Sequence, residues 1–222
     1  SSAGMGTDQI VALTTAQAAA LTTLQASVLS TAQVAAFEAA DAQSLSTQAV
    51  LALGTAQIGA LSTAAIAALT TAQLVSGIAT DISGLTTSQI VALTSAQVSS
   101  LSTAQAAAMT SLQLGAIESS DLTSLPAAYL AALNSAQLAG FGTAAIAALS
   151  TSQWTSGFAT RISALSSAQI AGMTTAQAEA LSAQQAASMT TAQVAAIETA
   201  DLQARSEEHT SELQSRVDIS YA

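Results

Sequence analysis

The sequence contains no cysteine and no lysine, and its basic side chains amount to three arginines and one histidine. The absence of cysteine excludes disulfide bonds and thiolate metal sites, and it leaves the redox compartment open. Nucleic-acid binding rests on clustered Lys and Arg side chains, so we expect no nucleic-acid partner. Aromatic residues make up 3% of the chain and charged residues 7%, whereas half of the residues are hydrophobic. The core must therefore consist of small and aliphatic side chains.

Long apolar runs are missing as well. No stretch of about 18 apolar residues is free of Ser, Thr or Gln, so the sequence predicts no membrane span. The chain begins SSAGMG, without the basic and apolar regions of a signal peptide. We therefore expect a fragment of a longer chain, with residues 1–4 as its edge and with flanking domains as its partners.

What the chain does contain is an eight-residue repeat, which fills residues 5–204 with 25 consecutive octads. LTTAQAAA from Leu13, LSTAQVAA from Leu29 and LTTSQIVA from Leu85 are examples. Numbered from the Leu, position 1 is apolar in all octads except those that start at Gly77 and Gly157, position 2 is mostly Ser or Thr, and position 5 is Gln in 16 octads. Such a pattern indicates a repeat architecture.

The octad does not suit one continuous helix or a strand. Eight residues advance an α-helix by about 80° beyond whole turns, so the Leu residues would scatter over every face. Strands are disfavoured because Ala and Gln are weak strand formers and the apolar positions are spaced by five and three residues rather than two. An Ala-rich, low-complexity coil remains the alternative to a fold of short helices.

Each octad carries the signals that start a helix. The Ser or Thr at position 2 can cap the helix, and the Gln at position 5 then stands at N3, where it completes a capping box. The apolar residues at positions 1 and 6, such as Leu29 and Val34, form a hydrophobic staple. The predicted capping pairs include Thr14 with Gln17, Thr22 with Gln25, Ser30 with Gln33, Thr86 with Gln89, Thr94 with Gln97, and Thr190 with Gln193.

Helices of about six residues are unstable alone, so the octads must stack on one another. The sequence therefore predicts an all-α fold, a tightly wound α-solenoid with one very short helix per octad.

The octads also show a longer period. Every fifth octad departs from the consensus, and these unusual octads alternate between two types, so the full repeat is ten octads. The octads that start at Phe37, Gly77, Ile117, Gly157 and Ile197 depart from the consensus, and we interpret them as corners of the winding. Glu at position 2, as in Glu38 and Glu118, predicts that the preceding helix runs on, whereas Gly77 and Gly157 predict helix stops. If five octads make one superhelical turn, the position-5 corner residues form one ridge: Asp41, Asp81, Asp121, Arg161 and Asp201. Arg161 should then contact Asp121 or Asp201. Pairing of octads into 16-residue hairpins is the competing geometry.

Candidate catalytic or metal chemistry is sparse. One Asp in every five octads supplies too few oxygens for Ca²⁺, and His209 is the sole imidazole available to a nucleophile. Trp154 and Tyr129 are interpreted as packing variants. We therefore expect no enzyme, no catalytic residue, no metal and no cofactor. Regular Thr on an Ala-rich scaffold leaves one binding hypothesis open, a flat array that matches ice or another ordered surface.

Two resemblances concern the repeat region. Runs such as LSTAQVAAF from Leu29 and MTTAQVAAI from Met189 resemble the octapeptide repeats, L-[ST]-[ST]-A-Q-[IV]-A-A, of very large bacterial surface or secreted proteins. This resemblance implies a non-catalytic spacer or stalk of an adhesin-like protein, located outside the cell or on its surface. The phrase LTTAQ also resembles helix openings of other α-solenoids, including TAL effector repeats, but the DNA-reading residues and basic charge of those proteins are missing. A binding solenoid that presents a groove or a Thr-rich face to a peptide, a glycan or an ordered surface is the alternative.

The end of the chain, residues 205–222, breaks the octad pattern. RSEEHTSELQS from Arg205 resembles the translation of a widely used short-read sequencing adapter, and ISYA from Ile219 resembles the continuation of that adapter. We interpret residues 205–222 as a non-native tail and the chain as a metagenomic fragment.

Overall fold

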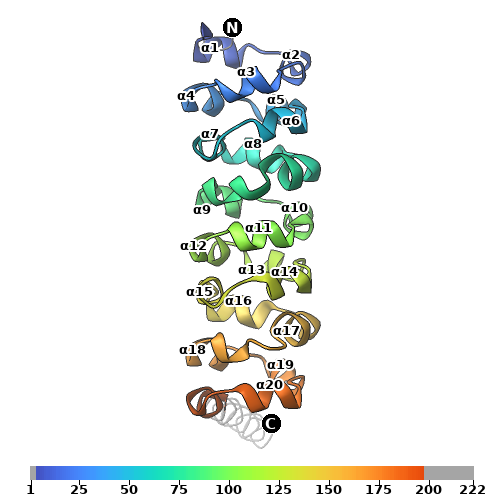
Figure 1. The fold of residues 1–222 in the computed structure, drawn as a ribbon, viewed down its shortest axis with the longest axis vertical. Helices are drawn as coiled ribbons and strands as arrows, with labels where there is room; N and C mark the ends of the chain where they lie inside the picture. The colour runs from blue at the N-terminus through green and yellow to red at the C-terminus, as the bar shows by residue number, and fades with distance from the viewer. Residues whose placement is uncertain (1–3, 198–222) are drawn as a thin grey trace, which may run out of the picture.

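The computed structural model describes residues 4–197, with the side chain of Thr80 excepted. The predicted tail and Asp201 lie outside the described residues. Within this range the chain is a rod of very short helices wound into a solenoid (Figure 1). Most α-helices have five or six residues, because each begins at its own capped position and ends before the next Leu. The prediction of an all-α solenoid with one helix per octad is confirmed.

The helices follow the octads in order. They are α1 (Thr7–Val11), α2 (Thr15–Ala19), α3 (Thr23–Ser27), α4 (Thr31–Ala35), α5 (Ala39–Ser44), α6 (Thr47–Leu51), α7 (Thr55–Ala60), α8 (Thr63–Ala68), the π-helical η2 (Gln73–Ile78), the 3₁₀-helical η3 (Ala79–Gly84), α9 (Thr87–Val91), α10 (Ser95–Ser100), α11 (Thr103–Ala108), α12 (Ser111–Gly115), α13 (Ser119–Leu122), α14 (Ala127–Ala132), α15 (Ser135–Leu138), α16 (Thr143–Ala148), α17 (Thr151–Gly157), the 3₁₀-helical η4 (Ile162–Ala164), α18 (Ser167–Ala171), α19 (Thr175–Glu179) and α20 (Ala183–Ser188). Residues 191–197 are also helical.

Helices pack on helices three octads away along the chain. The pairs include α2 with α5, α4 with α7, and α11 with α14. Helices α1, α4, α7, α9, α12, α15 and α18 recur down one side of the rod (Figure 1). They are three octads apart, except that α7 and α9, and α15 and α18, are four octads apart. This packing rules out the alternative in which neighbouring octads pair into 16-residue hairpins.

The five-octad turn predicted from the corner octads is wrong. Side chains of one turn contact the backbone of the preceding turn at separations of 28 and 31 residues, as Gln97 does with Leu69 and Ile66. Gly59 and Gly84, from adjacent turns, also approach each other, and a Cβ on Gly59 would lie 2.7 Å from the Gly84 carbonyl oxygen. A turn takes about 27 residues, since α1 and α18 begin at Thr7 and Ser167 on the same side of the rod and lie six turns apart (Figure 1). Its length is set by packing between helices and not by the spacing of the unusual octads.

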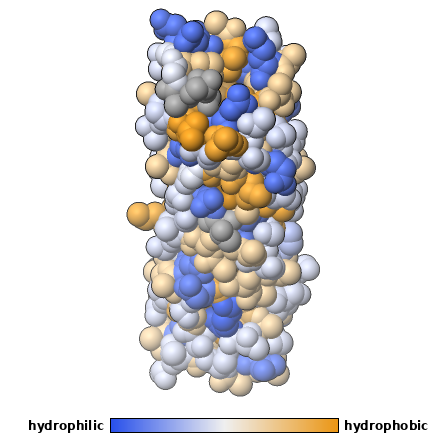
Figure 2. All heavy atoms as spheres, turned by 45° about the horizontal axis from the view of Figure 1, so that its top comes forward, coloured by the Kyte–Doolittle hydropathy of each residue, from blue (hydrophilic) through white to orange (hydrophobic). Residues whose placement is uncertain are grey.

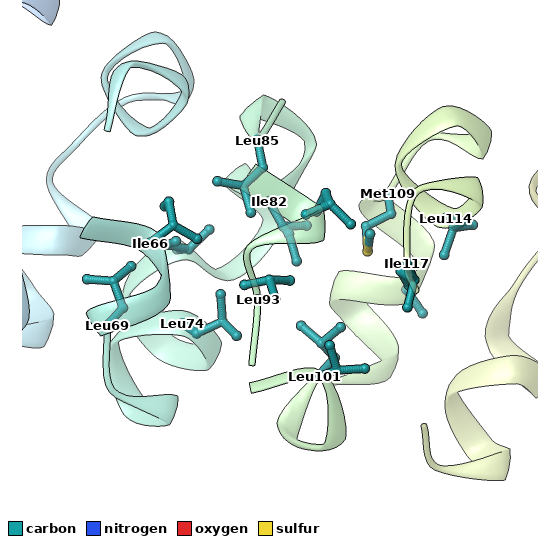
Figure 3. Close-up of a cluster of buried hydrophobic side chains, with 14 of the residues drawn as sticks. Ile66, Leu69, Leu74, Ile82, Leu85, Leu93, Leu101, Met109, Leu114 and Ile117 are labelled. Atoms are coloured by element: carbon teal, nitrogen blue, oxygen red, sulfur yellow. The ribbon is translucent and has the colours of Figure 1, made fainter. Parts of the chain in front are cut away.

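The core is one continuous column along the rod axis, built mainly from the apolar residues at positions 1 and 6. Figure 3 shows a central section, in which Ile66, Leu74 and Ile82, from three successive octads, lie in the interior between the short helices. Ile66, Leu74 and Ile82 are fully buried. Because the staple brings positions 1 and 6 to the same side of each short helix, every octad contributes to the same column.

The corner octads behave differently from the prediction. Glu38 and Glu118 do not extend the preceding helix, because both have extended backbone angles and stand as N-caps of α5 and α13, without a side-chain capping bond. The predicted helix stop is found at Gly157, which is the last residue of α17, whereas the helical run continues through Gly77 to Ile78. These glycines have no positive φ. They are required because a Cβ would lie 2.9 Å from Val50 Cβ at Gly77 and 2.8 Å from Leu130 Cβ at Gly157.

No helix within residues 4–197 is long and apolar enough to cross a membrane.

Candidate functional site

The repeated polar feature of the molecule is the pair of residues at positions 2 and 5. In α2, the backbone N–H of Gln17 donates to Thr14 Oγ1 at 3.3 Å, and Thr14 N–H donates to Gln17 Oε1 at 2.9 Å. This is a reciprocal capping box, which satisfies two backbone donors at the helix start. The same two bonds join the other predicted pairs, which are Thr22 with Gln25, Ser30 with Gln33, Thr86 with Gln89, Thr94 with Gln97, and Thr190 with Gln193.

The Gln side chains have a second role that the sequence reasoning missed. While Gln97 Oε1 caps α10, Gln97 Nε2 donates to the carbonyls of Ile66 at 2.9 Å and Leu69 at 2.8 Å in the preceding superhelical turn. Leu69 follows α8 directly, has an extended backbone and is the first residue of the next octad. One amide thus starts its own helix and joins two turns.

These cross-turn bonds recur along the rod, and we call the series the amide ladder. Its members are Gln33, Gln57, Gln73, Gln89, Gln97, Gln105, Gln113, Gln137, Gln153, Gln169, Gln177, Gln185 and Gln193. Nearly all of these side chains are buried, and Gln105 and Gln185 are fully inaccessible. One sequence signal could have indicated the ladder. A capping box accepts Glu as well as Gln, but no octad has Glu at position 5, so the side chain must also donate.

The ladder weakens where it meets the Gly octads. Gln105 donates to Leu74 O and Gln185 to Trp154 O, both 31 residues earlier. The residues 28 positions before them are Gly77, inside η2, and Gly157, the last residue of α17, whereas the residue 28 positions before Gln97 is the extended Leu69. Where helical structure replaces the extended residue at position 1, the amide keeps the bond to the carbonyl 31 residues earlier.

The predicted corner residues occupy position 5 and do not form one ridge. Asp81 Oδ1 accepts a hydrogen bond of 3.0 Å from Thr55 Oγ1, and Asp121 Oδ1 accepts one from Ser95 Oγ. Arg161 donates to the carbonyls of Leu130, at 3.2 Å, and Ala131. The described residues contain no ion pair between Arg161 and Asp121, because five octads exceed one superhelical turn.

Asp41 is the most buried of the described corner acids, with 3% of its surface exposed. Burial, together with the nearby negative charge of Glu38, raises the pKa of Asp41 above its ordinary value. Within residues 4–197, no group of three or more His, Cys, Asp or Glu residues is arranged to hold a metal ion.

The aromatic side chains of the described residues are all in the core. Trp154 and Phe158 pack with their ring centroids 5.0 Å apart, and Trp154 Nε1 has no hydrogen-bond partner. Tyr129 OH donates to Met109 Sδ at 2.9 Å, and burial raises the pKa of Tyr129.

On the face shown in Figure 2, strongly hydrophobic residues form small separate patches among weakly polar ones. A shallow, open depression lies between α12 and α15, lined by Leu112, Gly115, Ala139 and Gly140 among others.

The residues of the capping box also belong to the motif that identifies the family. Residues 12–17 and 68–73 both read ALTTAQ. The sequence model of the ALTTAQ repeat matches residues 34–71, 79–111 and 114–153, which is half of the chain. The chain belongs to the ALTTAQ repeat family. No curated protein and no solved structure matches it. In this ALTTAQ repeat protein, the Thr and Gln of the family motif are the capping pair, and the Gln is also the member of the amide ladder.

Proposed function

We propose that this ALTTAQ repeat region is a non-catalytic spacer or stalk within a large, adhesin-like bacterial protein, located on the cell surface or secreted. The observation that carries the proposal is the amide ladder, since each Gln both caps its own helix and bonds to the preceding turn. The recurring polar side chain of the octad is thus engaged in joining turns, and it is buried where a ligand would not reach it.

The architecture suits a spacer because its length follows from the number of octads. Each turn contacts its neighbours along the rod, so added turns lengthen the molecule and do not change its cross-section. Packed helices lie about 8 to 10 Å apart, and at about 27 residues per turn ten extra octads make about three turns and add about 25 to 30 Å.

The surface supports the spacer over a binding solenoid. Phe37, Tyr129, Phe141, Trp154 and Phe158 are buried, so the described surface offers no aromatic side chain for stacking on a glycan or a peptide. The hydroxyl of Thr14, like those of the other capping Thr residues, accepts a hydrogen bond from its own helix, which leaves it less available to an ordered surface such as ice.

The test is to duplicate residues 61–140 in the full chain and to measure the longest dimension by small-angle X-ray scattering. We expect an increase of about 25 to 30 Å with an unchanged cross-section. An unchanged length or a thicker particle would contradict the spacer. Thermal hysteresis of the unmodified chain would support the ordered-surface alternative instead. Labelling of intact cells that carry the gene with an antibody to the repeat tests the surface location.

A further inference from the structure

Two equivalent corner segments, ten octads apart, follow different backbone paths. Residues 73–84 form the π-helical η2 and then η3, whose first residue, Ala79, has φ 46° and ψ −126°. In the equivalent residues 153–164, α17 runs to Gly157 and η4 begins at Ile162. Ala79 is the one residue other than glycine with a positive φ among those described, so its counterpart Ala159 lacks this strain.

The packing of the two glycines does not account for the difference. A Cβ on Gly77 would meet Val50 Cβ and the Thr47 carbonyl, and a Cβ on Gly157 would meet Leu130 Cβ and the Ala127 carbonyl. Val50 and Leu130 are equivalent residues, as are Thr47 and Ala127. Both segments therefore rest on the preceding turn in the same way at this point.

The position-5 side chains do differ between the two segments. Arg161 donates to the carbonyls of Leu130 and Ala131, and so fixes its segment to the preceding turn as a ladder Gln would. Asp81 has no proton to donate when ionised, and it accepts from Thr55 instead. The carbonyls equivalent to those that Arg161 contacts are those of Val50 and Leu51.

We propose that residues 73–84 form a conformational switch in the winding, with the π-helical path and the α-helical path of residues 153–164 as its two states. The side chain at position 5 selects the state, because a donor to the preceding turn holds the α-helical path and an acceptor releases it. Strain at Ala79 brings the two paths close in energy. The state of the switch changes the bend of the rod at the corner that carries Asp81. The proposed switch does not depend on the spacer function.

The test uses the full chain and NMR of Ala79 and Ala159, whose ³J(HN,Hα) couplings and Cα shifts report the sign of φ. Asp81→Arg should move Ala79 to negative φ and slow amide exchange in residues 73–78 about tenfold, since the strained state is removed. Arg161→Asp is the matched reverse exchange, and it should give Ala159 the positive φ.

Substitution by glycine provides a second, independent readout. Ala79→Gly should hold the π-helical path and slow the exchange of residues 73–84, because glycine adopts positive φ without strain. Ala159→Gly should not slow the amide exchange of residues 153–164. A negative φ at Ala79 in the unmodified chain, or an Ala79 that keeps its positive φ in Asp81→Arg, would overturn the proposal.

Discussion

Residues 85–116 and residues 37–84 join adjacent turns by different means. The first segment has Gln at position 5 of all four octads, and Gln89, Gln97 and Gln113 each bridge two or more carbonyls of the preceding turn. The second has Gln in two of six octads. Its other position-5 residues include Ala49 and Ala65, which are fully buried. There the turns are joined by close apolar packing, such as Gly77 on Val50. The same solenoid therefore joins its turns by either a polar bridge or a tight apolar contact.

The largest expected effect on stability is that of Tyr129→Ala, in residues 117–164, which are the counterpart of residues 37–84 ten octads later. Tyr129 is fully buried and occupies the position held by Ala49 in the first copy. Tyr129→Ala should lower the free energy of unfolding by about 3 to 5 kcal/mol, because the neighbours cannot collapse into the space. Urea denaturation would measure the loss, and a loss under about 1 kcal/mol would mean that the segment repacks as it does around Ala49.

Removal of a ladder amide should have the next largest effect. Gln97→Ala removes one capping box and two cross-turn hydrogen bonds, and it should cost about 2 to 4 kcal/mol in the free energy of unfolding. Gln17→Ala is the matched control, since Gln17 is exposed and caps α2 without a preceding turn among the described residues, and it should cost about 1 kcal/mol. Equal losses in the two variants would show that capping alone matters.

A methyl group at a corner glycine should have a smaller effect. Gly157→Ala places a Cβ 2.8 Å from Leu130 Cβ, so overpacking should cost about 1 to 3 kcal/mol. Gly142→Ala, at a site with no atom within 4 Å of the added Cβ, controls for the change of residue type and should lose less than about 1 kcal/mol. Thermal unfolding compares the two variants, and an equally stable Gly157→Ala would contradict the close approach.

The smallest effect concerns pH and Asp41. Its raised pKa means that the folded state binds the proton more tightly than the unfolded state, so ionisation destabilises the fold. The penalty is complete above the folded pKa and absent below the unfolded value. Asp41→Asn should therefore raise the melting temperature at pH 7 and give no gain at pH 3. A gain of the same size at both pH values would show that the charge is not the cause.

Much of the fold could be predicted because its signals are local. The capping box lies within four residues of the chain, so Thr14 and Gln17 suffice to place the start of α2. The corners could not be predicted in the same way. Glu38 lacks the short hydroxyl side chain of a good cap but still stands as the N-cap of α5, because the stacking of the octads fixes the break. The adapter interpretation of residues 205–222 stays a prediction.

The sequence by itself determined that the chain forms very short helices, where most of them begin and which faces they bury, because capping and the staple act within one octad. Only the tertiary structure decided that a turn takes about 27 residues. It also decided that Gln at position 5 joins successive turns, and that Arg161 and Asp81 find partners in the preceding turn. These features depend on contacts between residues of adjacent turns, which the packing distance between helices sets and no single octad encodes.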